Sequence, residues 1–301
     1  DHRDLHSFPT RRSSDLRKSG RIETITEPLY DILLRRYLDP EQWRQVKQYS
    51  DDLGLAFFAT VGFEADIDLL IELNCDSIKI ASGDVTHWPL IRMAAKTGMC
   101  IQLDTGNATI GEIEQAVDIC RMEGNDQIII HNCPSGYPAR LESINLKMIP
   151  TLKQMFPQYP IAYSDHTPGW DMDIAAVALG ADLVEKTITT DKTIKSAEHI
   201  FSLEPSEMKA FVHAIRDVET AMGQPRRVLG PDAQARRKAV MRSTFVKKEM
   251  QQGDTIGLEH VEFRRPGFGI SPMQFESLAG MQLSRSVLAG HLLELQDLVA
   301  R

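Results

Sequence analysis

Short apolar runs alternate with amphipathic stretches along most of the chain after Arg17. The runs are rich in Ile, Leu, Val or Phe and lie close to Gly, Pro, Asp or Ser, a pattern typical of buried strands. They predict strands at Ala56–Thr60, Ser77–Ala81, Cys100–Asp104, Gln127–Asn132, Ile161–Ser164 and Leu183–Thr187. The stretches between them predict helices at Asp39–Leu53, Glu64–Leu73, Pro89–Thr97, Ile110–Glu123, Ile144–Phe156 and Met172–Gly180.

Capping residues mark several of these helix ends. Asp39 followed by Pro40 suits the N-cap and the first position of a helix. Gly124 and Gly180 suit the turns that end two others. A further helix is expected from Pro205 to Met222.

A strand followed by a helix recurs roughly every 20–30 residues, which indicates parallel strands joined by crossover helices. Polar residues cluster where the strands end, the position at which a TIM (β/α)8 barrel carries its active site. They are Thr60, Ser82, Asp84, Asp104, Thr105, His131, Asn132, Ser164, Asp165, His166, Glu185 and Lys186. We therefore expect an α/β fold, a TIM barrel that lacks its first two strands. A doubly wound open sheet is the alternative, which the lack of a G-x-G-x-x-G motif after these runs disfavours.

The chain ends are interpreted separately from this barrel. Residues 1–16 lack apolar periodicity and a signal-peptide core, and they can be decoded as DNA that resembles a common sequencing adapter. We therefore expect the partial barrel to span residues 17–223, with two leading strand–helix units cut away. A linker rich in Pro, Gly and Arg is expected at 224–238. A small domain is expected at 239–301, with short strands at Ser243–Lys247 and Val261–Arg264 and a helix near Pro272–Leu278.

Composition narrows the functional class. Apolar residues make up 42% and charged residues 25% of the chain, as in an ordinary soluble protein. A net charge of -8 argues against non-specific binding to nucleic acid or to an anionic membrane. No apolar run approaches the length of a membrane span. The four cysteines show no paired motif, so we expect buried, reduced thiols and a cytoplasmic location.

The strand ends carry residues that suit an anionic substrate. Alternation along its strand would turn Lys79 into the barrel, where a lysine needs an anion. A phosphate that also accepts a hydrogen bond from Ser82 meets this need, and a neighbouring carboxylate is the alternative. His166 suits a metal ligand or an acid–base group. Together with Glu185 and the proline-stiffened loop that holds Ser135, these groups favour an anionic or phosphorylated substrate and a polyhydroxylated one.

An ordered set of motifs resembles the sialic acid synthases, that is, N-acetylneuraminate synthases and their legionaminate and pseudaminate relatives. The motifs are KIASGD (79–84), DTGN (104–107), YP (137–138), SDHT (164–167), EK (185–186) and SAEHIFSLEP (196–205). The tail, with FRRPGFGI at 263–270, resembles the antifreeze-like (SAF) domain of that family. The resemblance runs from about residue 28 to the C-terminus.

The resemblance implies that the complete protein joins phosphoenolpyruvate to N-acetylmannosamine or a related amino-sugar aldehyde and releases phosphate. A divalent metal, Mn2+ or Mg2+, would polarise the aldehyde. The implied phosphoenolpyruvate ligands are Thr60, Lys79, Ser82, Ser135 and Ser164. The implied catalytic and sugar-side groups are Asp84, Glu185, Glu198 and Tyr137, and His166 matches a metal ligand. Arg265 matches an arginine that the small domain of one subunit inserts into the other subunit's site, which implies a domain-swapped homodimer.

Three positions depart from the family pattern. Thr187 stands where a second metal histidine is expected, so His199 or Asp104 would have to compensate. Asp104 itself stands where a phosphate-binding hydroxyl is expected, and a carboxylate there would repel phosphate. Glu198 replaces the usual aspartate and has a longer reach.

These departures leave two alternatives to the synthase open. One is a non-catalytic or divergent sugar-binding relative. The other is a different phosphoenolpyruvate-condensing barrel, such as a synthase for heptulosonate or octulosonate sugars. We also expect the 301-residue chain by itself to be inactive and poorly soluble, because an open barrel leaves sheet edges unpaired.

Overall fold

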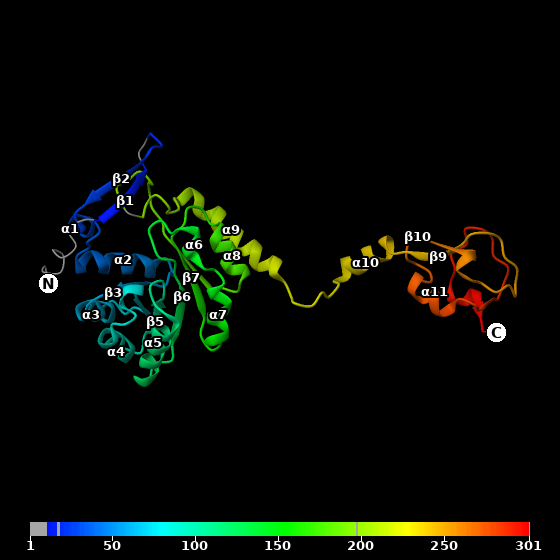
Figure 1. The fold of residues 1–301 in the computed structure, drawn as a ribbon, viewed down its shortest axis with the longest axis horizontal. Coiled ribbons are helices and arrows are strands. Elements are labelled where there is room, and N and C mark those ends of the chain that lie inside the picture. The colour runs from blue at the N-terminus through cyan, green and yellow to red at the C-terminus, as the bar shows by residue number, and fades with distance from the viewer. Residues whose placement is uncertain (1–10, 17–18, 197, 301) are drawn as a thin grey trace. The chain divides into compact units, whose positions relative to one another are not determined.

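The computed structural model describes residues 11–16 (backbone only), 19–196 and 198–300. The chain forms two compact units that divide after Gly223. The first unit contains a parallel sheet with its covering helices, and Figure 1 shows it in blue to yellow-green. The division falls one residue after the end of helix α9 (Pro205–Met222).

Six parallel strands form the sheet of the first unit. They are β3 (Phe58–Val61), β4 (Ser77–Ile80), β5 (Cys100–Asp104), β6 (Ile128–Asn132), β7 (Ile161–Asp165) and β8 (Leu183–Lys186). Their order in the sheet is their order in the sequence. A doubly wound sheet reverses its strand order partway, whereas a barrel adds each strand beside the previous one. The observed order therefore confirms barrel topology and the predicted strands.

Nine α-helices accompany these strands in the described part of the first unit. They are α1 (Leu29–Leu34), α2 (Pro40–Asp52), α3 (Glu64–Glu72), α4 (Trp88–Lys96), α5 (Ile110–Met122), α6 (Leu141–Ile144), α7 (Met148–Met155), α8 (Asp171–Ala178) and α9. The predicted start of α2 is confirmed, because the Asp39 carboxylate accepts from the Gln42 N–H at 2.8 Å. The predicted helix Ile144–Phe156 is wrong at its start. Asn145 adopts a left-handed conformation with φ of 49°, which ends α6 before α7 begins.

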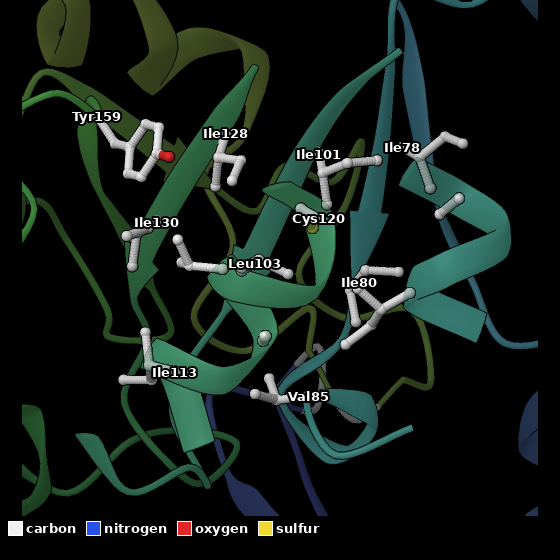
Figure 2. Packing of buried hydrophobic residues seen from close by; sticks show 14 of the residues in the cluster. Ile78, Ile80, Val85, Ile101, Leu103, Ile113, Cys120, Ile128, Ile130 and Tyr159 are labelled. Carbon is white, nitrogen blue, oxygen red and sulfur yellow. The ribbon is translucent and has the colours of Figure 1, made fainter. Parts of the chain in front are cut away.

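Alternate residues of the central strands build the apolar core. Figure 2 shows how the side chains from β4, β5 and β6 pack against α5. The labelled strand residues in this layer are Ile78, Ile80, Ile101, Leu103, Ile128 and Ile130. Since successive side chains of a strand point to opposite faces, the residues between them face the other side of the sheet. That second set includes Lys79, Gln102, Asp104 and His131.

The sheet is strongly curled. Strands β4 and β8 are four positions apart in the sheet, which in a flat sheet would separate them by about 19 Å. Yet the Nζ atom of Lys79 on β4 lies 2.6 Å from the Oε1 atom of Glu185 on β8. The polar face of the sheet is therefore concave, and its side chains converge as they do inside a barrel.

A two-stranded antiparallel hairpin precedes the sheet. Strand β1 (Arg11–Leu16) pairs with β2 (Ile22–Glu27) from Arg11 opposite Glu27 to Leu16 opposite Ile22. The sequence interpretation leaves residues 1–16 out of the fold, whereas in the structure the backbone of residues 11–16 pairs with β2. Backbone hydrogen bonds of this kind do not depend on a particular side-chain pattern. Residues 1–10 lie outside the described part.

The second unit has its own small core. It contains β9 (Ser243–Val246), β10 (Val261–Arg264), α11 (Pro272–Leu278), β11 (Gln282–Leu283) and β12 (Leu298–Val299) around Ile256, Phe275 and Leu293. Helix α10 (Pro231–Val240) begins within the predicted linker, 224–238, and ends two residues beyond it. Its Ala, Gln, Arg and Lys residues are good helix formers, and they are exposed or half-buried.

Two further expectations concern location and thiols. In the described part of the chain, no helix has both the length and the apolar composition needed to cross a membrane. All four cysteines are free thiols, as expected. Cys75, Cys120 and Cys133 are buried and Cys100 is half-buried.

Candidate active site at the carboxyl ends of the strands

Lys79 lies at the centre of the concave face, bound by two carboxylates. Its Nζ atom lies 2.6 Å from both carboxylate oxygens of Glu185 and 3.0 Å from the Oδ2 atom of Asp104. The lysine side chain is only 7% exposed. In the structure, Lys79 is therefore paired with neighbouring carboxylates, which was the alternative to a phosphate. The cluster contains one cationic group and two carboxyl groups.

Burial and the lysine set the ionisation of these carboxyl groups. Burial raises the pKa of Asp104 to about 6, although Lys79 works in the opposite direction. Burial acts likewise on Glu185, but Lys79 outweighs it and holds the pKa of Glu185 below its usual value. Burial would lower the pKa of Lys79, and the two carboxylates more than offset this and raise it. Glu185 and Lys79 are therefore ionised at neutral pH. Of the three groups, Asp104 has its pKa nearest to neutral pH.

His131 faces the same cluster in a fixed orientation. Its Nε2 atom lies 3.0 Å from the Oε1 atom of Gln102, whose Nε2 atom donates to Ser77 at 2.5 Å. The Nε2 atom of His131 must then carry the hydrogen, which leaves a lone pair on Nδ1. Nδ1 lies 3.7 Å from the Oδ1 atom of Asp104. Both atoms are buried, and the described residues provide neither with a hydrogen-bond partner.

Hydroxyl and amide groups surround the charged centre. Ser164 donates to the Oε1 atom of Glu185 at 3.0 Å. Asn107 donates to the Oγ atom of Ser82 at 3.0 Å and accepts from Ser135 at 3.3 Å. Asn107 thus connects two predicted phosphate ligands that lie on different loops. It belongs to the DTGN motif, but the sequence analysis gave it no role.

His166 lies at the other side of the site, in an aromatic setting. Its ring stacks on Tyr137, with ring centroids 4.3 Å apart, and Phe201 lies 6.0 Å away. Burial lowers the pKa of His166 and outweighs the carboxylates of Glu198, Glu185 and Asp165, so the imidazole is neutral near pH 7. Its Nδ1 atom is buried and has no hydrogen-bond partner within the described residues.

Glu198 is held by an arginine that the sequence analysis did not identify. The Nη1 atom of Arg36 donates to the Oε1 atom of Glu198 at 3.0 Å, and Nη2 donates to Ser196 at 3.0 Å. Arg36 and Glu198 are 162 residues apart in the chain. No local pattern could have paired them, because only the folded chain brings the segment after α1 beside the loop after β8.

The remaining predicted residues lie in three places. Thr60 lies on β3, directly opposite Lys79 in the strand register, and is exposed. Asp84 ends a short 3-10 turn, Ser82–Asp84, that follows β4. Arg265 lies in the second unit, where its Nε atom donates to the carbonyl of Val240 at 2.7 Å. The structure therefore brings together most of the predicted barrel residues, and Arg265 belongs to a separate unit.

A second charged cluster lies behind the site, on the face covered by helix α8. Lys186 contacts the carboxylate of Asp165, donates to the carbonyl of Thr167 at 2.7 Å and lies 3.3 Å from Asp173 of α8. The Thr167 hydroxyl also donates to Asp165 at 2.9 Å. These bonds fix the backbone on both sides of His166.

This arrangement suits the binding of an anion, and it also suits the stabilisation of a positive charge that develops on the substrate. A lysine, several hydroxyls and an asparagine can bind a phosphate group. An ionised Glu185 beside them can stabilise a cation that develops on the reacting carbon. The stacked ring of Tyr137 and the Arg36–Glu198 pair offer polar and aromatic contacts to a sugar.

Known proteins resemble this chain in sequence. A model of the NeuB family matches residues 8–227. An uncharacterized protein of Methanocaldococcus jannaschii is 36% identical, covering 80% of this chain and 71% of its own length. An N,N'-diacetyllegionaminic acid synthase of Legionella pneumophila is 32% identical over 93% of this chain and 79% of its own. The human N-acetylneuraminate-9-phosphate synthase is 33% identical, covering 73% of this chain and 61% of its own length.

Solved structures resemble it in fold. An N-acetylneuraminic acid synthetase of Leptospira borgpetersenii superposes with a TM-score of 0.64 at 30% identity, covering 68% of this chain and 72% of that one. A spore coat polysaccharide biosynthesis protein of Bacillus subtilis gives a TM-score of 0.60 at 30% identity, over 88% and 79%. With the family model covering well over half of its length, the chain belongs to the NeuB family.

Proposed function

We propose that the complete protein condenses phosphoenolpyruvate with N-acetylmannosamine or a related amino-sugar aldehyde. C3 of phosphoenolpyruvate would form a bond to the aldehyde carbon, water would add at C2, and the C2–O bond would break to release phosphate. The products are a sialic-acid-type nonulosonate and phosphate. The observation that carries this proposal is the Lys79–Glu185 pair, a buried cation and an ionised carboxylate beside the hydroxyl of Ser164.

The phosphate side of the site is the best defined. We assign phosphate binding to Lys79 together with the hydroxyls of Ser82, Ser135 and Ser164, and the substrate carboxylate to Thr60. Asn107 supports this assignment, because it holds Ser82 and Ser135 on one side of the site. Glu185 would stabilise the positive charge that develops at C2, since Lys79 keeps it ionised.

The sugar side rests on residues at the rim. We assign Asp84 and Glu198 to the hydroxyls of the sugar, and Tyr137 to its ring, with Glu198 held in place by Arg36. The named relatives act on different nonulosonates, so the acceptor is proposed only as a class. The longer reach of Glu198 and its arginine partner are the features through which this chain would choose its acceptor.

The proposal includes a divalent metal, Mn2+ or Mg2+, with His166 as its protein ligand. The Nδ1 atom of His166, buried and without a hydrogen-bond partner among the described residues, suits a metal ligand. The described residues, however, do not gather three histidine, cysteine or carboxylate side chains around one point. Thr187 does not replace the missing imidazole, since its buried hydroxyl is a poor ligand for such an ion. These residues therefore do not fit a complete protein cage, and none of the steps above is routed through the ion.

The second unit is proposed to act at the active site of the other subunit in a homodimer. We propose that it is an antifreeze-like (SAF) domain whose Arg265 reaches the partner's site. Intersubunit complementation tests this: Arg265→Ala and Glu185→Gln would each be inactive alone. An equimolar mixture of the two variants would recover about a quarter of the activity, because half of its dimers are mixed and each mixed dimer has one intact composite site out of two. No recovery from verified mixed dimers would contradict the shared site.

Phosphate release tests the proposed reaction. The proposal includes a closed eight-stranded barrel, two strands more than the sheet described here, so the experiment uses the product of the complete gene. The protein is incubated with phosphoenolpyruvate, Mn2+ and either N-acetylmannosamine or diacetamido sugars, with Glu185→Gln as the control. Sugar-dependent release that the variant lacks is expected. A folded protein that releases no phosphate with any sugar would contradict the proposal and favour a sugar-binding relative.

A further inference from the structure

Asp104 occupies an unfavourable position for a site that binds phosphate. It is 8% exposed, and its Oδ2 atom lies 3.0 Å from Lys79, the cation assigned to the phosphate. Glu185 already binds the same lysine through both of its oxygens. With both carboxylates ionised, the cluster carries one net negative charge before any substrate enters. An anion that approaches Lys79 therefore meets repulsion from Asp104.

The geometry around Asp104 provides a place for a proton. Its Oδ1 atom has no hydrogen-bond partner among the described residues, and neither has the Nδ1 atom of His131, 3.7 Å away. Gln102 fixes the histidine so that Nδ1 presents a lone pair. A proton on Oδ1 would turn these two orphaned acceptors into a donor and an acceptor after an approach of less than about 1 Å. One proton would thereby satisfy two buried polar atoms.

Other titratable groups face Asp104 from each neighbouring element, and none of them competes for this proton above pH 7. From β4 comes Lys79, whose pKa is raised, and from β8 comes Glu185, whose pKa is lowered. Burial lowers the pKa of His131 on β6 to about 4. Burial raises the pKa of the Cys133 thiol, just after β6, to about 12. Lys79 and Glu185 stay charged, and His131 and Cys133 stay neutral.

We propose that phosphoenolpyruvate binding at Lys79 is coupled to the uptake of one proton from solvent, which Asp104 holds on Oδ1 toward His131. This inference rests on the proposed function. The neutral carboxyl releases Lys79 to the incoming phosphate and removes the repulsion. When phosphate leaves, Asp104 returns the proton to solvent and binds Lys79 again. Asp104 is thus a positioning residue that acts through Lys79.

Calorimetry counts this proton directly. Phosphoenolpyruvate is titrated into the complete-gene product between about pH 7.5 and about pH 9, where the phosphate is already fully ionised. Measuring the binding heat in buffers of different ionisation enthalpy gives the number of protons taken up. We expect about one proton, and a Kd that weakens about 30-fold across the range, tenfold per pH unit.

Two variants and one control locate the proton. Asp104→Asn, which has the shape of the neutral carboxyl, should bind without proton uptake and with a Kd that stays within about twofold over the range. Asp104→Thr repeats the test in case the amide perturbs folding. Asp118→Asn, on the exposed face of α5, should behave as the unmodified protein. An infrared difference spectrum of the unmodified protein should also gain a protonated-carboxyl band on binding, which Asp104→Asn lacks.

The outcomes separate this inference from the proposed function. Binding of phosphoenolpyruvate without proton uptake, or uptake that persists in both Asp104 variants, would overturn the role of Asp104 and leave the synthase reaction intact. No binding of phosphoenolpyruvate at any pH, by a folded protein that also releases no phosphate with any sugar, would overturn both.

Discussion

Replacing Lys186 by methionine should destabilise the barrel unit strongly. The lysine side chain is 3% exposed, and it lies between the fully buried carboxylates of Asp165 and Asp173. Methionine keeps much of its length but removes the charge and the hydrogen bond to the carbonyl of Thr167. The two carboxylates would then face each other without a cation.

Breaking a buried ion pair from one side typically costs about 3–5 kcal/mol, because the remaining charge is buried and unpaired. This cost should depend on pH. Burial and the neighbouring Asp165 already raise the pKa of Asp173, and loss of Lys186 raises it further. A carboxyl whose folded-state pKa is raised favours folding at low pH and loses this contribution as pH rises through that pKa. We therefore expect the full cost near pH 8 and a smaller one near pH 5.

Urea unfolding followed by tryptophan fluorescence measures this effect, because Trp43, Trp88 and Trp170 all lie in the first unit. Lys153→Met is the matched control. Lys153 binds Asp182 at 2.7 Å, but the two side chains are 38% and 44% exposed, so its loss should cost less than about 1 kcal/mol. Equal destabilisation by the two variants, or a Lys186→Met effect that does not change with pH, would refute the reasoning.

Three further predictions concern the site of the complete protein. Thr187→His should restore a second imidazole near His166 and lower the Mn2+ concentration for half-maximal activity at least about tenfold, as metal titrations would show; an unchanged titration would contradict it. Lys79→Met should weaken phosphoenolpyruvate binding about a hundredfold or more in calorimetry, and unaltered affinity would place the phosphate elsewhere. Arg36→Ala should raise the KM for the amino sugar and leave that for phosphoenolpyruvate unchanged, because Arg36 holds Glu198, which is assigned to the sugar, and its second bond goes to Ser196. Its thermal stability should shift little, since this pair is partly exposed.

The sheet was predictable from sequence because its strands are short, continuous apolar runs. Every strand of the six begins within two residues of its predicted start. Two features were not predicted, one that depends on the conformation of a single residue and one that depends on the antiparallel pairing of two polar segments. The break at Asn145 is one such case, since asparagine also occurs inside helices. The hairpin of β1 and β2 is another, because its strands carry no apolar alternation that separates them from a loop.

The polar residues at the strand ends were enough to predict where the site lies. Lys79, Ser164 and Glu185 were expected at neighbouring rims, and the structure brings them into contact. What the sequence could not predict were contacts between distant segments, such as Arg36 with Glu198. Nor could it predict that Asp104 and His131 would each have an atom without a hydrogen-bond partner in the described part of the chain, because this depends on side-chain orientation inside the curled sheet.

Carbon transfer tests the central claim most directly. Phosphoenolpyruvate labelled with 13C at every carbon is incubated with the complete-gene product, Mn2+ and each amino sugar, and the products are analysed by mass spectrometry. The account predicts a nonulosonate that carries all the labelled carbons of one phosphoenolpyruvate joined to the sugar, together with free phosphate. Label recovered only in pyruvate or in unreacted phosphoenolpyruvate would contradict it.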